Sequence, residues 1–396
     1  MSLTDTPNAS RLHIALFGRR NSGKSSLINA LTGQDTALVS DTPGTTTDLV
    51  SKAMEIQGIG PCLFIDTPGF DDEGELGELR ISRTLKAIEK TDIALLLCGD
   101  TTFSHEKEML TLLKEKNIPV IPVLNKIDIR ENSDHLATYI EEQCKIHPLL
   151  ISAKEKIGIE LIRQTILEKL PSDFGQQSIT GKLVAENDLV LLVMPQDIQA
   201  PKGRLILPQV QTIRELLDKK CLVMTCTTDK FSATLQALAR PPKLIITDSQ
   251  VFKAIYEQKP AESELTSFSV LFAGYKGDIH YYVESAAVIE RLTESSRVLI
   301  AEACTHAPLS EDIGRVKLPR LLRKRIGENL QIDMVAGTDF PQDLTPYSLI
   351  IHCGACMFNR KYVLSRIERA REQHIPMTNY GVAIAFLNGI LDQIKY

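Results

Sequence analysis

The segment that most restricts the fold of this chain is GRRNSGKS, residues 18–25. It follows the apolar run HIALF and precedes SLINALTG, whose pattern predicts a helix. Strand, glycine-rich loop and helix in this order are the context that a phosphate-binding loop of the form G-x-x-x-x-G-K-S requires. The glycines let backbone N–H groups point at phosphate oxygens, and the helix N-terminus adds its positive dipole end. The segment therefore predicts an α/β domain with a nucleotide site after its first strand.

The residues of this loop have distinct expected roles. Lys24 is expected to reach the β and γ phosphates, and the Ser25 hydroxyl to bind Mg²⁺. Taken alone, the motif also occurs in turns that bind no nucleotide. The residues expected to surround the phosphates are Gly18, Asn21, Ser22, Gly23, Lys24, Ser25 and Ser26.

Three further loops follow predicted strands in the order of a nucleotide-binding domain. Asp66 ends the run CLFI, where its carboxylate can hold the Mg²⁺ shell, and the Gly69 N–H can meet the γ phosphate. The loops after IPVIPVL and PLLI are expected to bind the base, through Asn125, Lys126, Asp128, Ser152, Ala153 and Lys154. All of these loops lie at carboxyl ends of parallel strands, where an open α/β sheet binds its ligand.

The expected base is guanine. The Asp128 carboxylate can accept hydrogen bonds from the N1–H and the 2-amino group of guanine. Adenine offers neither donor, so the buried carboxylate would be left unpaired, a penalty worth ~10⁴-fold in selectivity. The sequence therefore predicts GTP and GDP as ligands.

Apolar runs of strand length recur along the rest of the chain, separated by longer helical patterns. Continuous apolar runs of this kind are typical of parallel strands covered on both faces, so we expect α/β structure throughout. Two segments with Pro and small polar residues, 171–181 and 258–267, are expected linkers, and the first also contains Gly. They give three expected domains: a G domain at 1–175, a small α/β domain at 176–265 and a C-terminal α/β domain at 266–396. The expected strands lie in HIALFG, CLFIDTPG, DIALLLCG, IPVIPVLN, PLLISA, DLVLLVMP, CLVMTCT, KLIITD, SFSVLFAG, RVLIAEAC, QIDMVAG and SLIIHCG.

Charge and composition restrict the partners and the compartment. The 396 residues carry 45 Lys and Arg against 50 Asp and Glu, a formal net charge of -5, so no overall field draws the protein to nucleic acid. The N-terminus lacks a secretory signal pattern, and no apolar run approaches the ~18 residues of a membrane span. We therefore expect a cytoplasmic protein with no membrane or nucleic-acid partner. In a reducing compartment, metal binding is the expected use of clustered cysteines.

A second group of reactive side chains lies toward the C-terminal end. Cys304 and His306 follow the run RVLIAEA, while His352, Cys353 and Cys356 follow SLII. If these runs form neighbouring parallel strands, three thiols and two imidazoles converge. A single cysteine is more often a small core residue, but a convergent set predicts a metal site.

Two metal centres fit this set. Three cysteines and a histidine satisfy a structural Zn²⁺, but such sites are usually compact, and the long gap between the two clusters argues against one. A 4Fe-4S cluster needs a terminal ligand on each of four irons, and the three cysteines supply three of them. The fourth would be a histidine, a carboxylate such as Glu302 or Asp312, or solvent. We favour the iron–sulfur cluster, with zinc as the alternative.

The segment between the phosphate loop and Asp66 narrows the kind of G domain. SDTPGTTTD, residues 40–48, resembles the PGTTxD signature of the TrmE-Era-EngA-like GTPases. The resemblance implies that Thr46 closes on Mg²⁺ when the γ phosphate is present, with Thr45 and Thr47 as competing candidates. The catalytic residues are then expected to be Lys24, Thr46, Asp66 and Gly69.

The residue after Gly69 bears on the rate of hydrolysis. Phe70 stands where Ras-like proteins place the glutamine that orients the attacking water. Because a phenyl ring cannot orient water, intrinsic hydrolysis is expected to be slow. In potassium-activated members of the group a loop Asn binds K⁺ in place of an arginine finger, and Asn21 stands at the matching position. The resemblance implies K⁺-stimulated hydrolysis; the alternative is that Asn21 only stabilises the loop.

The G-domain motifs, the middle α/β segment and the C-x-H and H-C-x-x-C pairs together resemble the HydF family of FeFe-hydrogenase maturation GTPases. The resemblance covers essentially the whole chain, and the cysteine and histidine pattern makes it specific. It implies a GTPase domain, a dimerisation domain and a 4Fe-4S domain, assembled as a homodimer. Cys304, Cys353 and Cys356 would hold the cluster, while His306 and His352 would tune or transiently ligate it.

The resemblance also implies a function. Family members act as scaffolds that receive a di-iron subcluster built by two radical-SAM maturases and deliver it to apo-FeFe-hydrogenase. The cofactors would be GTP or GDP, Mg²⁺, K⁺ and the 4Fe-4S cluster, with the di-iron subcluster as cargo. Two other functions stay open: a translation or tRNA-modification GTPase with a structural zinc, and a signalling GTPase whose C-terminal cysteines are only structural.

Overall fold

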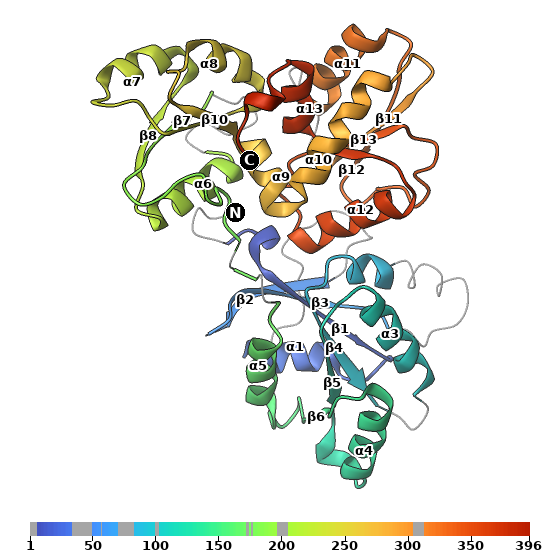
Figure 1. Cartoon of the computed structure of the whole chain (residues 1–396). Coiled ribbons are helices and arrows are strands. Elements are labelled where there is room, and N and C mark those ends of the chain that lie inside the picture. The colour runs from blue at the N-terminus through green and yellow to red at the C-terminus, as the bar shows by residue number, and fades with distance from the viewer. Residues whose placement is uncertain are drawn as a thin grey trace. The chain divides into compact units, whose positions relative to one another are not determined.

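The structure is a computed structural model, and it describes residues 6–33, 50–56, 58–69, 83–99, 103–171, 174–175, 177–195, 205–303 and 313–396. The chain divides into two compact units, Met1–Gly175 and Gln176–Tyr396. Each unit combines parallel strands with helices, so the predicted α/β class is confirmed (Figure 1). Among the described residues, no helix is both long and apolar enough to cross a membrane.

The described strands of the first unit form one six-stranded sheet in the order β2-β3-β1-β4-β5-β6. All neighbours are parallel except β2, which pairs antiparallel with β3 at the edge. The carboxyl ends of the five parallel strands therefore share one edge of the sheet. The strands are β1 (Leu12–Gly18), β2 (Val50–Ile56), β3 (Gly60–Asp66), β4 (Ile93–Cys98), β5 (Val120–Leu124) and β6 (Leu149–Leu150).

Helices cover both faces of this sheet because successive residues of a buried strand point to opposite sides. In β1, Ile14 and Leu16 pack into one core with α1 (Lys24–Thr32) and α5 (Ile159–Glu168). Ala15 and Phe17 of the same strand pack into another core, with α3 (Ser104–Glu115) and α4 (Ser133–Cys144). The strand is therefore apolar throughout.

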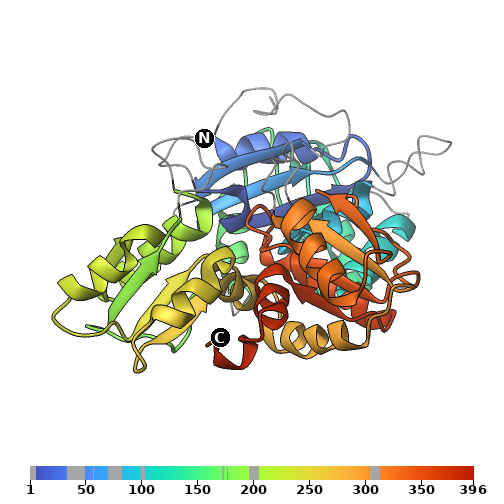
Figure 2. The ribbon, with the colours of Figure 1, turned by 90° about the horizontal axis from the view of Figure 1, so that it is seen from above.

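Two four-stranded, all-parallel sheets are described in the second unit, in the orders β10-β9-β7-β8 and β12-β11-β13-β14. Figures 1 and 2 show helices flanking the strands of both sheets. The first sheet contains β7 (Leu189–Val193), β8 (Leu222–Cys226), β9 (Leu244–Thr247) and β10 (Glu264–Ser267). The second contains β11 (Arg297–Glu302), β12 (Gln331–Ala336), β13 (Leu349–His352) and β14 (Met377–Asn379).

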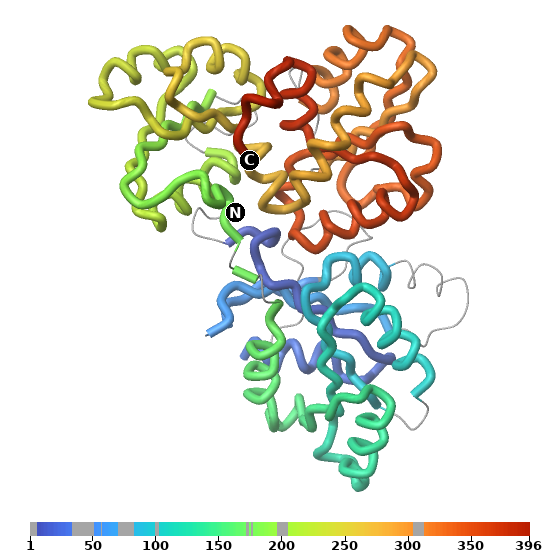
Figure 3. Tube along the Cα trace, viewed as in Figure 1, coloured from blue at the N-terminus to red at the C-terminus, as the bar shows by residue number. Residues whose placement is uncertain are grey.

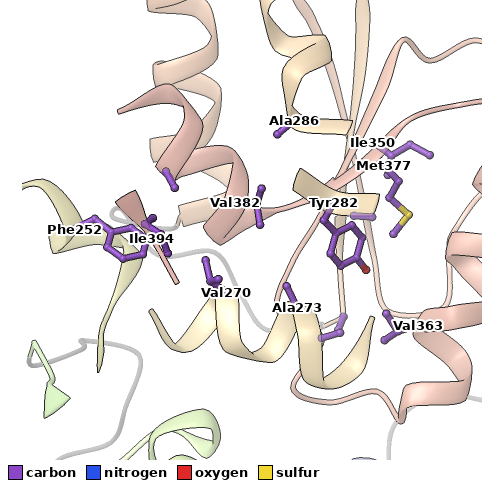
Figure 4. Close-up of a cluster of buried hydrophobic side chains, with 14 of the residues drawn as sticks. Phe252, Val270, Ala273, Tyr282, Ala286, Ile350, Val363, Met377, Val382 and Ile394 are labelled. Atoms are coloured by element: carbon purple, nitrogen blue, oxygen red, sulfur yellow. The ribbon is translucent and has the colours of Figure 1, made fainter. Parts of the chain in front are cut away.

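One hydrophobic core joins the two sheets of the second unit. It contains Ile245 of β9, Leu299 of β11 and Ile350 of β13, with helix residues between them. Figure 4 shows part of this core, in which Val270 and Ala273 lie near Val382. The helices of this unit are α6 (Leu207–Asp218), α7 (Phe231–Ala237), α8 (Phe252–Gln258), α9 (Phe268–Lys276), α10 (Ile279–Ala286), α11 (Leu318–Ile326), α12 (Arg360–Glu372) and α13 (Tyr380–Leu387).

The last residues of the chain return to the first of these two sheets. Ile394 belongs to the shared core, and the Lys395 N–H donates to the Leu265 carbonyl of β10 over 3.0 Å. Figure 3 shows this red C-terminal segment beside the yellow part of the chain. This hydrogen bond therefore joins the C-terminal segment to a sheet whose strands lie more than a hundred residues earlier in the sequence.

Some expected elements differ from the structure. SFSVLFAG, expected as a strand, forms helix α9, because that run is buried on several sides and its apolar continuity does not distinguish a strand from a buried helix. The linker expected at 258–267 contains β10, which pairs in register with β9. The strands β2 and β14 were not expected. The domain limits near 175 and 265 stay predictions.

Candidate nucleotide and metal sites

The phosphate loop joins β1 to α1 in a conformation that uses the left-handed backbone region. Gly23 precedes α1 with φ of 95°, and a Cβ there would collide with the Asn125 side-chain amide. Lys24 is buried, and its Nζ donates to the carbonyls of Gly18 (2.9 Å) and Arg19 (2.8 Å). The lysine thus lies over the loop in which its sequence motif predicts the phosphates.

The two residues expected at Mg²⁺ contact each other. Ser25 Oγ donates to Asp66 Oδ2 over 2.6 Å, and Asp66 is the last residue of β3. Burial raises the pKa of the Asp66 carboxyl, while the hydrogen bond from Ser25 and the charge of Lys24 lower it. A cation held between these oxygens would favour the ionised carboxylate, as a Mg²⁺ site requires.

Asn125 connects three loops of the predicted nucleotide site. Its Nδ2 donates to the Ser22 carbonyl over 3.0 Å, and its Oδ1 accepts from the N–H groups of Lys126 (2.8 Å) and Ala153 (3.0 Å). The side chain is buried. Asn125 therefore fixes the phosphate loop relative to the two loops expected to bind the base.

Asp128 and Ser152, predicted to act on the base, lie side by side. Ser152 Oγ donates to Asp128 Oδ1 over 2.6 Å, and this hydrogen bond lowers the pKa of the Asp128 carboxyl. The selectivity argument assumed a buried carboxylate, but Asp128 is exposed. The Asp128 carboxylate must therefore be shielded from water by the bound base itself.

The remaining predicted residues of this site are less constrained. Asn21 is exposed and adopts φ of 58° within the loop. Ser26 and Lys154 are also exposed, and Gly69 follows β3 among the described residues. The switch residues Thr45, Thr46 and Thr47, and Phe70, lie outside the described residues. One contact was not predicted: Arg19 Nε pairs at 3.0 Å with the buried carboxylate of Glu106 on α3, and no motif marks either residue.

In the second unit, the two strands that precede the cysteines are parallel neighbours, as expected. β11 pairs with β13 so that Ala301 lies opposite His352. The Ala303 N–H donates to Cys353 Sγ over 3.0 Å, and the Ala355 N–H donates to the same sulfur over 3.4 Å. Cys304, the residue after Ala303, lies outside the described residues, as do His306 and Asp312.

A cavity of about 260 Å³ borders the cysteine loop. Cys353, Gly354 and Cys356 line it together with Glu302 and Tyr380. Glu302 accepts a hydrogen bond from the Tyr380 hydroxyl (3.3 Å) and from Arg315 Nε (3.2 Å), so its carboxylate is held at the cavity. Within the described residues no group of three or more His, Cys, Asp or Glu side chains is arranged to hold a metal ion.

The hydrogen bonds around His352 argue against its expected role as an iron ligand. The imidazole is buried, with Nδ1 2.8 Å from the Cys353 carbonyl and Nε2 2.9 Å from an Arg366 guanidinium nitrogen. Because arginine only donates, Nε2 must accept and Nδ1 must carry the proton. Burial and the adjacent Arg366 charge lower the pKa of His352 to about 3. Both ring nitrogens are therefore already used.

Cys353 is partly buried. Burial raises its pKa to about 12, against the opposing effect of the Ala355 N–H. A metal that binds this sulfur must displace its proton. Two buried cations near the loop were not predicted: Arg366, and Lys276, whose Nζ donates to the Phe358 carbonyl. A signal for Arg366 exists in the sequence, because it falls on the apolar stripe of α12 formed by Tyr362, Val363, Ile367 and Ala370.

Family models match three successive parts of the chain. The model of a 50S ribosome-binding GTPase matches residues 13–126. The hydrogen maturase F dimerization domain matches residues 179–277, and the hydrogen maturase F tetramerization domain matches residues 280–395. These last two models together span more than half of the 396 residues.

Similar curated proteins match less than half of this chain. The tRNA modification GTPase MnmE of Nitrosomonas europaea is 39% identical over 160 residues, which are 40% of this chain and 34% of that protein. GTPase Der of Wolinella succinogenes is 35% identical over 194 residues, covering 45% of this chain and 40% of that protein. The chain thus spans little more than a third of the length of these relatives.

Two solved structures are among those that match part of this chain. Era, crystallised with MgGDPNP and a fragment of 16S ribosomal RNA, is 19% identical, with a TM-score of 0.35 over 55% of this chain and 93% of that one. The G domain of the T. maritima FeoB iron transporter is 24% identical, with a TM-score of 0.33 over 40% of this chain and 98% of that one.

Proposed function

The chain belongs to the hydrogen maturase F family, and from this we propose that it is a GTP-hydrolysing scaffold of FeFe-hydrogenase maturation. In this proposal Cys304, Cys353 and Cys356 hold a 4Fe-4S cluster. The di-iron subcluster is the cargo, received from two radical-SAM maturases and delivered to apo-FeFe-hydrogenase. The proposed domains are a G domain at 1–175, a dimerisation domain at 176–265 and a cluster domain at 266–396.

One observation carries this proposal. The parallel pairing of β11 with β13 brings Ala303 within hydrogen-bond distance of the Cys353 sulfur. Ala303 directly precedes Cys304 in the sequence, and this supports the proposal that the two halves of the cysteine pattern act together. Cysteines that served only as core residues would not require β11 and β13 to pair in this register.

The described residues fit an iron–sulfur cluster. Backbone N–H groups already donate to Cys353 Sγ, and such hydrogen bonds stabilise a sulfur that carries negative charge. A Cβ at Gly354 would meet no atom of the described residues within 4 Å. When bound by three thiolates, the cluster would supply one iron with an exchangeable ligand position. Glu302, whose carboxylate lines the cavity, is the described candidate for that position.

In the first unit we propose that Lys24, Ser25 and Asp66 act on the phosphates and Mg²⁺. The loop carbonyls that accept from Lys24 are neutral, and phosphate oxygens are stronger, charged acceptors, so a nucleotide would draw the ammonium away from the carbonyls. The Ser25 hydroxyl would bind Mg²⁺ directly, with Asp66 in its outer shell. Gly69 and Thr46 would close on the γ phosphate.

Slow, K⁺-stimulated hydrolysis is part of the same proposal. Phe70 offers no group to orient the attacking water, and Asn21 is exposed in the loop that would surround the phosphates. A K⁺ bound by Asn21 would supply the positive charge that an arginine finger supplies elsewhere. A cytoplasmic location belongs to the proposal as well.

We further propose a homodimer formed through β8. This strand is the last in its sheet, and among the described strands only β7 pairs with it, so its other backbone edge is unpaired. Leu222 and Met224 on β8 are 50% and 40% exposed, which is unusual for two large apolar residues of one strand. Addition of the same strand from a second copy would cover both.

The experiment that tests the scaffold proposal is anaerobic reconstitution with iron and sulfide. The purified protein is expected to turn brown, with broad absorption near 400 nm as an approximate signature of cysteine-ligated clusters. A Cys304/Cys353/Cys356 triple serine variant is expected to lose this absorption. Cys226→Ser, in the same unit but at the end of β8, is the matched control and is expected to keep it.

The outcomes separate the candidate functions. A colourless wild-type protein that holds one zinc would overturn the cluster proposal and favour the tRNA-modification type of GTPase, the class to which MnmE belongs. If the Cys226→Ser control lost iron as fully as the triple variant, the loss would report general unfolding and not ligand removal. Melting curves of all variants measure that directly.

A further inference from the structure

Arg366 is a buried cation with no carboxylate partner in the described part of the chain. It lies on α12 with 1% of its surface exposed. Its guanidinium packs against the rings of Phe340 (4.7 Å), Phe358 (4.6 Å) and Tyr362 (4.7 Å). Its hydrogen-bond partners among the described residues are all neutral: His352 Nε2, the Gly337 carbonyl and the Tyr362 hydroxyl.

A charge in this position is expensive unless a negative charge lies nearby. Moving a charged group out of water costs several kcal/mol even after relaxation, and neutral acceptors with aromatic rings recover only part of that. Arginine keeps its proton in proteins, so it cannot avoid this desolvation cost by becoming neutral. The charge of Arg366 therefore implies an anion in its surroundings, and none of the described carboxylates forms an ion pair with it.

The thiolates of the cysteine loop are the groups that can supply this negative charge. Arg366 contacts His352, and His352 contacts the Cys353 carbonyl, so two hydrogen bonds lead from the guanidinium to the backbone of a proposed ligand. The Cys353 sulfur itself accepts a hydrogen bond from the Ala303 N–H over 3.0 Å, so it lies in an environment that stabilises negative charge. Thiolates holding a cluster carry net negative charge, which increases when the cluster is reduced.

We propose that Arg366 is the fixed countercharge of the cysteine site and that, by occupying Nε2 of His352, it also denies this imidazole to the iron. Arg366 and His352 are then positioning residues and not ligands. The inference rests on the proposed function, since it needs a cluster at the cysteines. A positive charge near the cluster stabilises the more negative, reduced form, so it raises the reduction potential.

The test uses the full-length protein, reconstituted anaerobically, and measures the reduction potential by spectroelectrochemical titration. Arg366→Met, which keeps much of the side-chain volume, is expected to shift the potential to a more negative value. Arg366→Lys keeps the charge and is expected to stay close to wild type. Arg369→Met is the matched control: it lies on the same helix and over the same Phe340 ring at 5.7 Å, but is only partly buried.

A second readout reports on the imidazole. In Arg366→Met the Nε2 of His352 loses its hydrogen-bond donor and is no longer denied to the iron. The EPR line shape of the reduced cluster is therefore expected to change. Adding His352→Phe to Arg366→Met is expected to reverse that change. Unchanged potential and line shape in a fully loaded Arg366→Met protein would overturn the inference. If that variant failed to fold, Arg366→Gln, which removes the charge but keeps an amide donor, would decide: a negative shift supports the countercharge, and a potential equal to wild type contradicts it. A wild-type protein that takes up no cluster would instead contradict the proposed function.

Discussion

Asn125 illustrates how one side chain can set the geometry of a nucleotide site. Its side-chain amide donates to the Ser22 carbonyl and accepts from the N–H groups of the two loops predicted to bind the base, so these hydrogen bonds all go to backbone groups. Gly23 lies against it because no larger residue fits. The motif residues around Asn125 were recognisable in the sequence, since each loop follows an apolar strand at the same sheet edge.

The choice of base is expected to depend on the Asp128 carboxylate. Asp128→Asn replaces one acceptor with an amide donor, so GTP affinity should fall by at least about 100-fold, because hydrogen bonds to a charged group are each worth roughly 1.5–3 kcal/mol. Xanthosine triphosphate, with a carbonyl at the 2-position, should bind the variant better than GTP. Calorimetric titration with both nucleotides measures the change. Asp134→Asn, exposed on α4, is the control, and equal loss in both variants would contradict the role of Asp128.

Potassium is expected to stimulate hydrolysis through Asn21. Phosphate release should be faster in K⁺ than in Na⁺ at equal ionic strength, and Asn21→Ala should abolish the difference while leaving GTP binding largely intact. The reason is that a monovalent cation at this position would neutralise charge that develops in the transition state. Equal rates in the two salts, or a K⁺ effect that survives Asn21→Ala, would leave only a loop-stabilising role for this residue.

At the scale of elements, uninterrupted apolar runs marked most of the strands, one such run proved to be a helix, and polar strands were missed. β1 and β4 are buried along their whole length and were expected as strands. β2 reads VSKAMEI, with polar residues interspersed, because it is an antiparallel edge strand. α9 was misassigned because Val270, Leu271 and Phe272 are all buried, so no polar face marks its helical period. The pairing of His352 with Arg366 joins a strand to a helix, which local sequence patterns do not report.

Glu215 of α6 anchors the segment that leads into the second unit. Its carboxylate accepts from the Ile179 N–H, from the Thr180 N–H and hydroxyl, and from the Ser178 hydroxyl. Glu215→Ala leaves these donors without an acceptor and is expected to lower the free energy of unfolding by about 2–4 kcal/mol. Chemical denaturation measures this. Glu257→Ala, exposed on α8, is the control and should be close to neutral.

The same carboxylate predicts a dependence of stability on pH. Burial opposes ionisation of Glu215, but the hydrogen bonds from Thr180, Ile179 and Ser178 outweigh it and lower its pKa below 4.5. The unfolded state therefore binds the proton first as the pH falls, and the contribution of Glu215 is full above about pH 4.5 and is lost through the lower folded pKa. In Glu215→Ala the difference from wild type should shrink as the pH is lowered below 4.5. A constant difference would mean that packing, not charge, carries the effect.

At the scale of the whole molecule, self-association is expected to use the open edge of β8. Leu222→Asp combined with Met224→Asp places two charges on that edge, and burying them against a second copy would be costly, so the assembly should dissociate. Light scattering at micromolar concentration gives the mass. Leu161→Asp, an equally exposed leucine on α5, is the control and should keep the wild-type mass. A wild-type protein that is already monomeric would contradict the dimer itself.

The core shared by the two sheets of the second unit bears on how this family could have been assembled. Ile245, Leu299 and Ile350 belong to one set of buried side chains, and Lys395 closes onto β10. The G domain belongs to a compact unit of its own, Met1–Gly175. The two C-terminal domains share one unit, and a cut between residues 277 and 280 would leave each half of their core facing water. If gene fusion adds or removes the GTPase, these two domains should still be inherited together, and they should unfold in a single cooperative transition.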